Sequence, residues 1–333
     1  MADHQQNTSS LNDFDQTEVM VGFDIIGDVH GHADRLRSLL SLMGYTEEDD
    51  VWSHPKRSAA FVGDLIDRGP GQLETLRIVR AMVEAGSAQI VLGNHEFNAV
   101  AYATVDPVRL DYCRPHSDKN SSQHEAFLSD VPFGSPLHRS IIDWFMAIPM
   151  WLDLGGLRVV RACWSPKHIA HLAAEAGSSN TLTERIVIDG TTKGTPTHDA
   201  IETVLKGPEV DLDGAWYEDK DGHRRHRARL RWWDSGATTL NDAALIPSGT
   251  KLFDADDREI ETFPDRQLRD DEVQPYNGPE PVLFGHYWWR KESAEPINPL
   301  ATCLDYSVAK NGVLRAYRWD GETEIDPTKF VDD

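Results

Sequence analysis

The chain has 333 residues, 40% of them hydrophobic, and a formal net charge of −22. Because such an acidic surface repels nucleic acids and anionic lipids, we expect no nucleic-acid partner and no membrane partner. The sequence has no apolar run of membrane length and no signal segment, and its three cysteines form no CxxC pair; we therefore expect a cytoplasmic protein, with a periplasmic location left open.

The beginning of the chain differs in composition from the rest. Residues 1–19 are almost entirely polar or charged and predict a flexible tail. The remainder, 20–333, is long enough for one large domain with a substantial hydrophobic core.

Three short apolar runs follow the tail, and each ends in a glycine and a polar cluster. They are FDIIGDVHG (23–31), AAFVGDLIDRGP (59–70) and AQIVLGNHE (88–96). The first two precede 33–43 and 71–85, where apolar residues recur every three or four positions, as is typical of helices. This alternation of strand, loop and helix predicts an α/β domain, whose ligands bind beyond the carboxyl ends of the strands.

Two segments of different composition interrupt this alternation of strands and helices. Residues 104–140 are polar, and 165–280 combine a helix near 197–206 with Gly/Pro loops. We interpret both as insertions that wall a cleft. The first holds a predicted capped helix in 112–127; a substrate wall is the alternative there, and a metal site at His116 and His124 is left open because their spacing fits two helical turns. The second holds HRRHRARLRWW (223–233), either a half-buried strand with a solvated basic face or a cleft wall for an anionic substrate.

The second half of the chain contains further predicted strands. LRVVRACWSP (157–166) and PVLFGHYWW (281–289) again join an apolar run to polar residues. Near the C-terminus we expect ATCLDYSVAK (301–310) and VLRAYRWDG (313–321) to pair as a β-hairpin across an Asn311-Gly312 turn.

The loops after the first three strands carry side chains that suit a metal ion. They offer carboxylates, an amide and imidazoles, from Asp28, His30, Asp64, Asp67, Asn94 and His95. Such oxygen and nitrogen donors suit Mn²⁺, Fe or Zn²⁺, and the absence of thiolates argues against a structural zinc site. Glu96 either supports these residues or merely opens the following helix.

GDxHG, GDxxDRG and GNHE, in this order over residues 27–96, resemble the calcineurin-like metallophosphoesterases. The likeness is to the phosphoprotein-phosphatase branch, which includes Ser/Thr protein phosphatases and symmetrical diadenosine tetraphosphatases. ACW (162–164) and GHYW (285–288) are similar to a bacterial subgroup. The resemblance implies a four-layer α/β/β/α sandwich of two mixed sheets, with a metal site at the carboxyl ends of the strands.

The resemblance also implies a role for each matching residue. Two divalent cations would be held by Asp28, His30, Asp64, Asn94 and His286, with Asp64 bridging them and a bridging hydroxide as nucleophile. Arg68 would bind the phosphate as a fork, and His95, positioned by Asp67, would protonate the leaving oxygen.

Arg161 departs from the family's pattern, which has a histidine ligand of the second metal there. A guanidinium remains protonated and has no lone pair for a cation. Three interpretations are open. In the first, the second metal is weak or absent and Arg161 binds the phosphate. In the second, His168 or Cys163 replaces the missing ligand, and in the third Arg161 lies away from the site. We favour an altered second site.

The implied function is metal-dependent hydrolysis of a phosphoric ester. We expect a phosphomonoesterase that acts on a phosphorylated protein or a small phosphorylated metabolite. One alternative is a symmetrical dinucleoside tetraphosphate hydrolase, which would need aromatic surfaces for two nucleosides. The other is a catalytically impaired binding or regulatory relative, for which Arg161 is the support.

Overall fold

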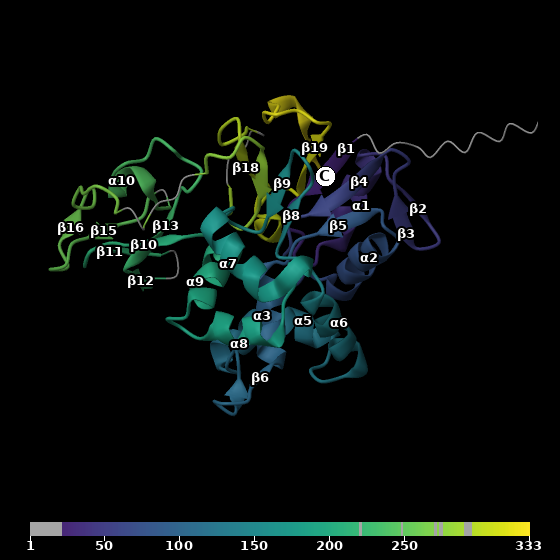
Figure 1. Cartoon of the computed structure of the whole chain (residues 1–333), viewed down its shortest axis with the longest axis horizontal. Coiled ribbons are helices and arrows are strands. Elements are labelled where there is room, and N and C mark those ends of the chain that lie inside the picture. The colour runs from purple at the N-terminus through teal and green to yellow at the C-terminus, as the bar shows by residue number, and fades with distance from the viewer. Residues whose placement is uncertain (1–21, 220–221, 248, 270–271, 273–275, 290–294) are drawn as a thin grey trace, which may run out of the picture.

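The computed structural model describes residues 22–219, 222–247, 249–269, 272, 276–289 and 295–333. The predicted tail at 1–19 lies outside the described residues. Two mixed β-sheets face each other, with helices packed around them (Figure 1), which confirms the predicted α/β architecture. Within the described part of the chain, no helix is both long and apolar enough to cross a membrane.

The first sheet has the strand order β20-β19-β1-β4-β5. The strands are β1 (Gly22–Ile26), β4 (Arg57–Phe61), β5 (Ala88–Ile90), β19 (Arg315–Trp319) and β20 (Phe330–Asp332). β1, β4 and β5 are parallel, whereas β19 and β20 are antiparallel to their neighbours. α1 (Ala33–Leu42) and α2 (Gln72–Glu84) follow β1 and β4, as predicted, with a small hairpin of β2 (Thr46–Glu48) and β3 (Val51–Ser53) between them.

The second sheet has the strand order β18-β17-β9-β8. The strands are β8 (Trp151–Asp153), β9 (Arg158–Val160), β17 (Val282–Phe284) and β18 (Ala301–Cys303). β9, β17 and β18 are parallel, and β8 is antiparallel to β9. The strands predicted in 157–166 and 281–289 are therefore neighbours in one sheet.

The predicted C-terminal hairpin is wrong, because its two strands belong to different sheets. β18 pairs with β17, with Thr302 opposite Leu283, whereas β19 pairs with β1, with Tyr317 opposite Ile25. A two-residue hairpin turn of the Asn-Gly type needs positive φ at both positions. Here only Asn311 has it, at 62°, and a short 3-10 helix, η2 (Val308–Lys310), precedes it.

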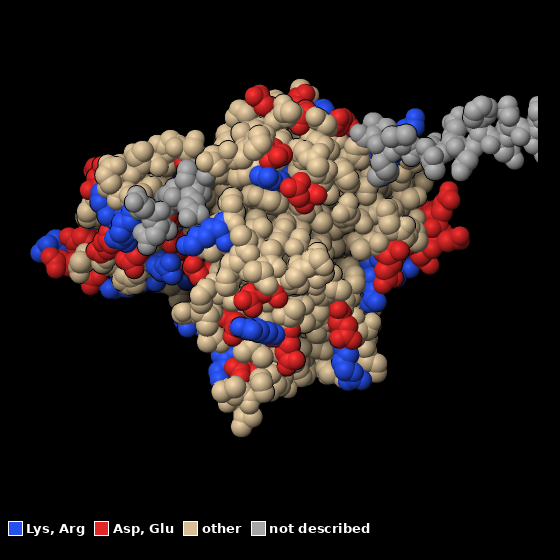
Figure 2. Space-filling view, in the orientation of Figure 1, with Lys and Arg blue, Asp and Glu red and all other residues tan. Residues whose placement is uncertain are grey.

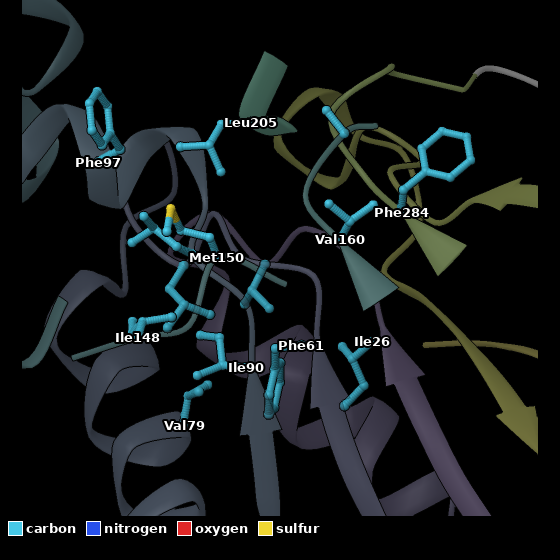
Figure 3. Packing of buried hydrophobic residues seen from close by; sticks show 14 of the residues in the cluster. Ile26, Phe61, Val79, Ile90, Phe97, Ile148, Met150, Val160, Leu205 and Phe284 are labelled. Atoms are coloured by element: carbon cyan, nitrogen blue, oxygen red, sulfur yellow. The ribbon is translucent and has the colours of Figure 1, made fainter. Parts of the chain in front are cut away.

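The hydrophobic core has one layer between the sheets and others outside them. Ile25, Val159 and Leu283 belong to the layer between the sheets. On the outer face of the first sheet, Ile26 and Phe61 pack in one cluster with residues of α1 and α2 (Figure 3). On the second sheet, Phe284 stacks against Trp233 at 5.3 Å between ring centroids, so aromatic side chains cover that outer face.

Helices and short strands make up the predicted insertions. The first, with the helix before it, contains α3 (Asn94–Ala103), β6 (Val105–Asp106), β7 (Asp111–Tyr112), α4 (Asp118–Gln123), α5 (Glu125–Asp130) and α6 (Pro136–Met146). The second begins with α7 (Pro166–Ala176), η1 (Gly177–Ser179), α8 (Glu184–Thr191) and α9 (Pro196–Lys206). Ser117 caps α4, as expected for the capped insertion helix. The remaining short 3-10 helix, η3 (Pro327–Lys329), lies outside the insertions, before β20.

The second insertion continues into a small β region with its own hydrophobic cluster, at the left of Figure 1. Its elements are β10 (Glu209–Asp211), β11 (Trp216–Glu218), β12 (Arg224–Arg225), β13 (Arg227–Leu230), α10 (Leu240–Ala243), β14 (Ala244–Leu245), β15 (Leu252–Phe253) and β16 (Glu259–Ile260). In β13 Ala228 and Leu230 are buried while arginines alternate with them, which confirms the strand interpretation of 223–233. Basic and acidic side chains intermingle on this part of the surface (Figure 2).

A close approach of two glycines brings the loops after β4 and β5 together. Gly63 has φ of +87°, and a Cβ built on it would lie 2.6 Å from the Cα of Gly93. Only glycine at position 63 satisfies both the left-handed backbone and the contact. These two loops carry Asp64 and Asn94, so their spacing depends on this contact.

We predict that Gly63→Ala lowers the free energy of unfolding by about 3 kcal/mol, measured by urea denaturation, because left-handed strain and overpacking add. Gly134→Ala is the matched control. Gly134 also has positive φ, +72°, but a Cβ there would meet nothing within 4 Å. It should cost only about 1 kcal/mol, the backbone contribution. Equal losses in the two variants would show that the loop contact is not tight.

Candidate functional site

Five strand ends from both sheets meet at one edge of the sandwich. Asp28 follows β1, Asp64 follows β4 and Asn94 opens the helix after β5. From the second sheet, Arg161 follows β9 directly and His286 follows β17. Because the carboxyl ends of parallel strands lie at the same edge of a sheet, residues far apart in sequence come together here.

The backbone is unusual at this edge. Residues with side chains and positive φ include His30 (46°), Asp64 (54°), Asp67 (64°), Arg68 (84°) and His286 (73°). This conformation costs roughly 1–2 kcal/mol for each such residue and tends to cluster at functional sites. The fold therefore keeps strained turns where the polar side chains converge.

His30 is oriented as a metal ligand. Its Nδ1 donates to the carbonyl oxygen of Ile66 at 3.0 Å, which leaves Nε2 facing Oδ2 of Asp28 and Oδ2 of Asp64, each at 3.7 Å. Burial lowers the pKa of His30 to about 3, so the imidazole is neutral and its lone pair is available. His30, Asp64 and His95 each offer one ligand atom, and these three atoms lie within 4.8 Å of one another.

His286 lies on the other side of Asn94. Its Nδ1 is 2.8 Å from Oδ1 of Asn94. Burial, followed by the charge of Arg229, lowers the pKa of His286 well below its usual value, so this imidazole is also neutral. Its Nε2 is buried without a hydrogen-bond partner in the described part of the chain. A neutral imidazole beside an amide oxygen suits a cation ligand.

The Arg161 guanidinium occupies the space among these ligands. It is 1% exposed and donates to both carboxylate oxygens of Asp28, at 2.7 and 2.6 Å. It also bonds to Oδ2 of Asp64, and its Nε donates to Oδ1 of Asn94 at 3.2 Å. A Cβ at Gly285 would collide with Arg161 and Asp28, so the glycine before His286 makes room for this ion pair.

These contacts bear on whether the residues fit a cation. His30 and Asp64 offer a neutral and an anionic donor of the type that a divalent cation binds. Arg161 bonds to Oδ2 of Asp28 and Oδ2 of Asp64, the oxygens that face Nε2 of His30, and to Oδ1 of Asn94 beside His286. The donors therefore suit a metal ion in type, while Arg161 competes for their oxygens and its charge opposes a cation.

The contacts around Arg161 exclude two of its three interpretations. The interpretation that Arg161 lies away from the site is wrong, since it contacts three of the expected ligands. His168 does not replace the missing ligand, because it bonds to Ser165 and Asp199, at 2.7 and 3.2 Å. Cys163 lies in the hydrophobic cluster, and burial raises the pKa of its thiol well above the usual value.

His95 and Asp67 form the predicted pair. Nδ1 of His95 is 2.6 Å from Oδ2 of Asp67, and its Nε2 is 3.8 Å from Oδ2 of Asp64. Burial opposes the charged imidazole, but Asp64 and Asp67 together raise the pKa of His95 above its usual value. His95 is thus able to carry a proton at neutral pH.

His124, from the first insertion, reaches the site as a partner of Asp67, a role that its sequence pattern did not indicate. Its Nδ1 is 3.0 Å from Oδ1 of Asp67, so Asp67 is held between two histidines. Although burial opposes ionisation, the hydrogen bonds from His124 and His95 lower the pKa of Asp67. His116 does not join His124 as a metal ligand, because its ring stacks between Tyr102 and Tyr112 at 3.7 and 3.9 Å.

Arg68 is exposed beside this pair. Its guanidinium lies over the ring of Trp288, 5.0 Å from the centroid, and Nζ of Lys310 lies 4.0 Å from the same ring. The indole therefore restrains the orientation of Arg68 through a cation–π contact while its donors remain accessible. This placement suits a side chain that binds an anion in solution.

Glu96 has the supporting role that the sequence left open. It is fully buried, and its carboxylate accepts hydrogen bonds from the backbone nitrogens of Asp64 and Leu65, at 2.9 and 2.8 Å. It thereby fixes the strained turn that presents Asp64. Asp305, which no sequence motif marks, similarly accepts hydrogen bonds from the backbone nitrogens of Trp288 and Ser307. Only its position just after a buried strand signals it in the sequence.

The chain is similar to several known proteins. The sequence profile of the family described as calcineurin-like phosphoesterase matches residues 22–288. A symmetrical bis(5'-nucleosyl)-tetraphosphatase from Vibrio cholerae serotype O1 is 30% identical over 313 residues, 89% of this chain and 94% of that protein. An asymmetrical bis(5'-nucleosyl)-tetraphosphatase from Halalkalibacterium halodurans is 51% identical over 74 residues, 22% of this chain and only 30% of that protein. A solved protein serine/threonine phosphatase from Saccharomyces cerevisiae has a TM-score of 0.48 at 12% identity, covering 96% of this chain and 80% of that one.

We predict that Arg161→His raises the number of metal ions bound per chain. The change removes the positive charge and adds an imidazole lone pair beside Asp64 and Asn94. Elemental analysis after loading with Mn²⁺ measures it. Arg161→Lys is the matched control, since it keeps the charge and should leave the metal content at the parent value. If Arg161→His binds no more metal than the parent, Arg161 does not occupy a cation position.

We predict that Glu96→Gln removes a pH dependence of stability. Burial, followed by the charge of Asp64, raises the pKa of Glu96 to about 7. Protonated Glu96 thus stabilises the fold most below pH ~4.5, and this contribution, roughly 3 kcal/mol, is lost as the pH rises through about 7. Urea denaturation of metal-free protein between pH 4.5 and 8 measures the difference from the parent.

In this comparison Glu96→Gln should gain stability relative to the parent as the pH rises. Glu84→Gln, which changes an exposed carboxylate on α2, should follow the parent at every pH. Parallel pH profiles of the parent and Glu96→Gln would show that Glu96 keeps an ordinary pKa in the folded protein.

Proposed function

This chain belongs to the calcineurin-like phosphoesterase family, and we propose that it hydrolyses phosphoric esters with the help of a bound divalent cation. The observation that carries the proposal is the His95–Asp67 pair, 2.6 Å apart, facing the donors of His30 and Asp64. A proton donor, an anion-binding arginine and metal ligands at one edge are the parts that phosphoryl transfer to water requires.

The cation would be held by His30 and Asp64, with Asp28 adjacent. When bound, a Mn²⁺, Fe or Zn²⁺ ion supplies a Lewis acid for the phosphoryl oxygens. Arg161 supplies a second positive charge that does not dissociate. A binuclear centre, which the family resemblance implies, would require Arg161 to leave the oxygens of Asp28 and Asp64.

The remaining side chains have separable tasks. Arg68 forks onto the phosphoryl oxygens, aligning the ester and offsetting its charge. His95 donates the proton that the leaving oxygen needs, from Nε2. Asp67 holds Nδ1 of His95 and thereby fixes the tautomer and the ring orientation, and His124 fixes Asp67 in turn. Arg161 donates its hydrogen bonds to Asp28, Asp64 and Asn94 and so supports these side chains. Direct contact between Arg161 and the phosphate stays a prediction.

Two substrate classes are candidates for this site. The sequence interpretation favours a phosphomonoester, on a protein or a small metabolite. The symmetrical bis(5'-nucleosyl)-tetraphosphatase from Vibrio cholerae, similar over nearly the whole of both chains, favours a dinucleoside tetraphosphate. Turnover of a phosphopeptide, a sugar phosphate and diadenosine tetraphosphate, measured as phosphate or nucleotide release, separates them.

A binding protein without activity fits the site less well. Such a protein does not need a histidine with a raised pKa, as His95 has, or a carboxylate held by two histidines, as Asp67 is. Nor does it need the accessible guanidinium of Arg68 beside them. We also propose a cytoplasmic location, since the three cysteines are unpaired and buried.

We predict that His95→Asn lowers kcat about 100- to 10,000-fold for an alkyl phosphate but much less for p-nitrophenyl phosphate. The nitrophenolate is a good leaving group and needs no proton, whereas an alkoxide does. Steady-state assays of the Mn²⁺-loaded protein with both esters measure this. His223→Asn, a change of an exposed histidine in the small β region, is the control and should match the parent. Equal losses on both esters would contradict the role of His95 as proton donor.

A further inference from the structure

The loop that joins β18 to β19 lies at the same edge of the sandwich as the candidate site. It follows β18, which runs parallel to β17, so it leaves the sheet beside the turn that carries His286. Asp305 joins the loop to that turn. Its Oδ2 accepts a hydrogen bond from the backbone nitrogen of Trp288 at 3.1 Å, and its carbonyl oxygen accepts one from the backbone nitrogen of Trp289 at 2.7 Å. The loop is therefore fixed to the residues that follow His286.

The backbone of this loop has an unusual conformation. Ser307 and Asn311 have positive φ, 61° and 62°, and Trp288 on the neighbouring turn has φ of 49°. Such conformations are strained for residues with side chains and tend to cluster at functional sites. Hydrogen bonds stabilise the turn, since the nitrogen of Ser307 donates to Oδ1 of Asp305 at 3.0 Å and its carbonyl oxygen accepts from the nitrogen of Lys310 at 2.7 Å. The loop thus presents Lys310 from a fixed turn.

Two positive charges lie beside the indole ring of Trp288. Cζ of Arg68 is 5.0 Å from the ring centroid, and Nζ of Lys310 is 4.0 Å from the same centroid. These two distances together set an upper limit of about 9 Å between the charges. Both cationic side chains are exposed, and the indole is half-buried. Arg68 follows Asp67, the partner of His95, so the two cations lie on the side of the site that holds the proposed proton donor.

The spacing of the two cations suits one phosphoryl group. Like charges this close repel each other, and an anion that contacts both removes the repulsion. The indole stabilises each cation through its ring face without neutralising either charge. A phosphoryl group that accepts a charge-assisted hydrogen bond of about 2.8 Å from each cation, through two different oxygens, spans a separation of this size.

Resting on the proposed function, we infer that Lys310 is a second phosphate-binding residue, which acts with Arg68 on the phosphoryl group being cleaved, and that Trp288 positions both. Arg68 binds two oxygens as a fork, whereas Lys310 adds a compact charge on a flexible side chain. A phosphomonoester carries close to two negative charges near neutral pH and gains from both cations, whereas a diester carries one and gains less. Lys310 therefore favours a doubly charged phosphoryl group.

The test is titration calorimetry of orthophosphate with the full-length Mn²⁺-loaded chain, freed of unbound metal. Lys310→Met should weaken orthophosphate binding about tenfold, the loss expected for one charge-assisted hydrogen bond, and Lys310→Arg should recover most of it. Trp288→Leu should cause a similar loss, and Trp288→Phe, which keeps an aromatic face, should recover part of it.

Steady-state assays add a measurement that a merely structural role would not affect. In Lys310→Met, KM for p-nitrophenyl phosphate should rise about tenfold while kcat changes much less, because the contact is lost equally in the bound substrate and the transition state. For bis(p-nitrophenyl) phosphate, a singly charged diester, KM should change much less. Equal rises in KM for the two esters would contradict a preference for the doubly charged group.

Lys56→Met is the matched control. Lys56 is also exposed, but it precedes β4 and so lies at the opposite edge of the first sheet from the site, and its change should leave orthophosphate affinity at the parent value. An unchanged affinity in Lys310→Met, or the same loss in Lys56→Met, would overturn the inference. Failure of the proposed function is distinguishable, because the parent would then hydrolyse neither ester while the orthophosphate affinities still measured the role of Lys310.

Discussion

The Arg161 guanidinium joins the two sheets at the edge where the site is built. Its hydrogen bonds reach Asp28, Asp64 and Asn94, which follow three parallel strands of the first sheet, while Arg161 itself follows a strand of the second. Removing one partner from a buried ion pair typically costs about 3–5 kcal/mol, because the remaining charges are left uncompensated. The side chains of Asp28, Asp64 and Asn94 are therefore tied to one another through this single cation.

That dependence changes what the site needs from a metal. In a site of acids and neutral imidazoles, cations alone offset the negative charge. Here Arg161 offsets part of it permanently, so the carboxylates of Asp28 and Asp64 are held in place before any ion arrives. The site thus combines the fixed positive charge of Arg161 with the charge of a metal ion that exchanges with solution. His30 keeps its lone pair for the latter, because Ile66 fixes its tautomer.

The sequence predicted the parts of the molecule that depend on local pattern. Each apolar run that ends in glycine became a buried strand, and the residues after it became the site. The pairing of β18 and β19 was not predictable, since strands buried on both faces carry no alternation that identifies their partners. Glu96 and His124 could not be placed for a related reason: their roles come from contacts with residues 31 to 57 positions away. Arg161 was recognised as unusual, but its partners became visible only in three dimensions.

The strand order of the first sheet has a consequence for how that sheet forms. β19 lies between β20 and β1, so β1 pairs with a strand that comes after both insertions in the chain. Until β19 is in place, β1 has an open edge, and the motif at its end belongs to an incomplete sheet. The site residues that follow β1 and β4 thus acquire their final support from a pairing between distant parts of the chain. Non-local pairings of this kind predict that the sheet closes slowly.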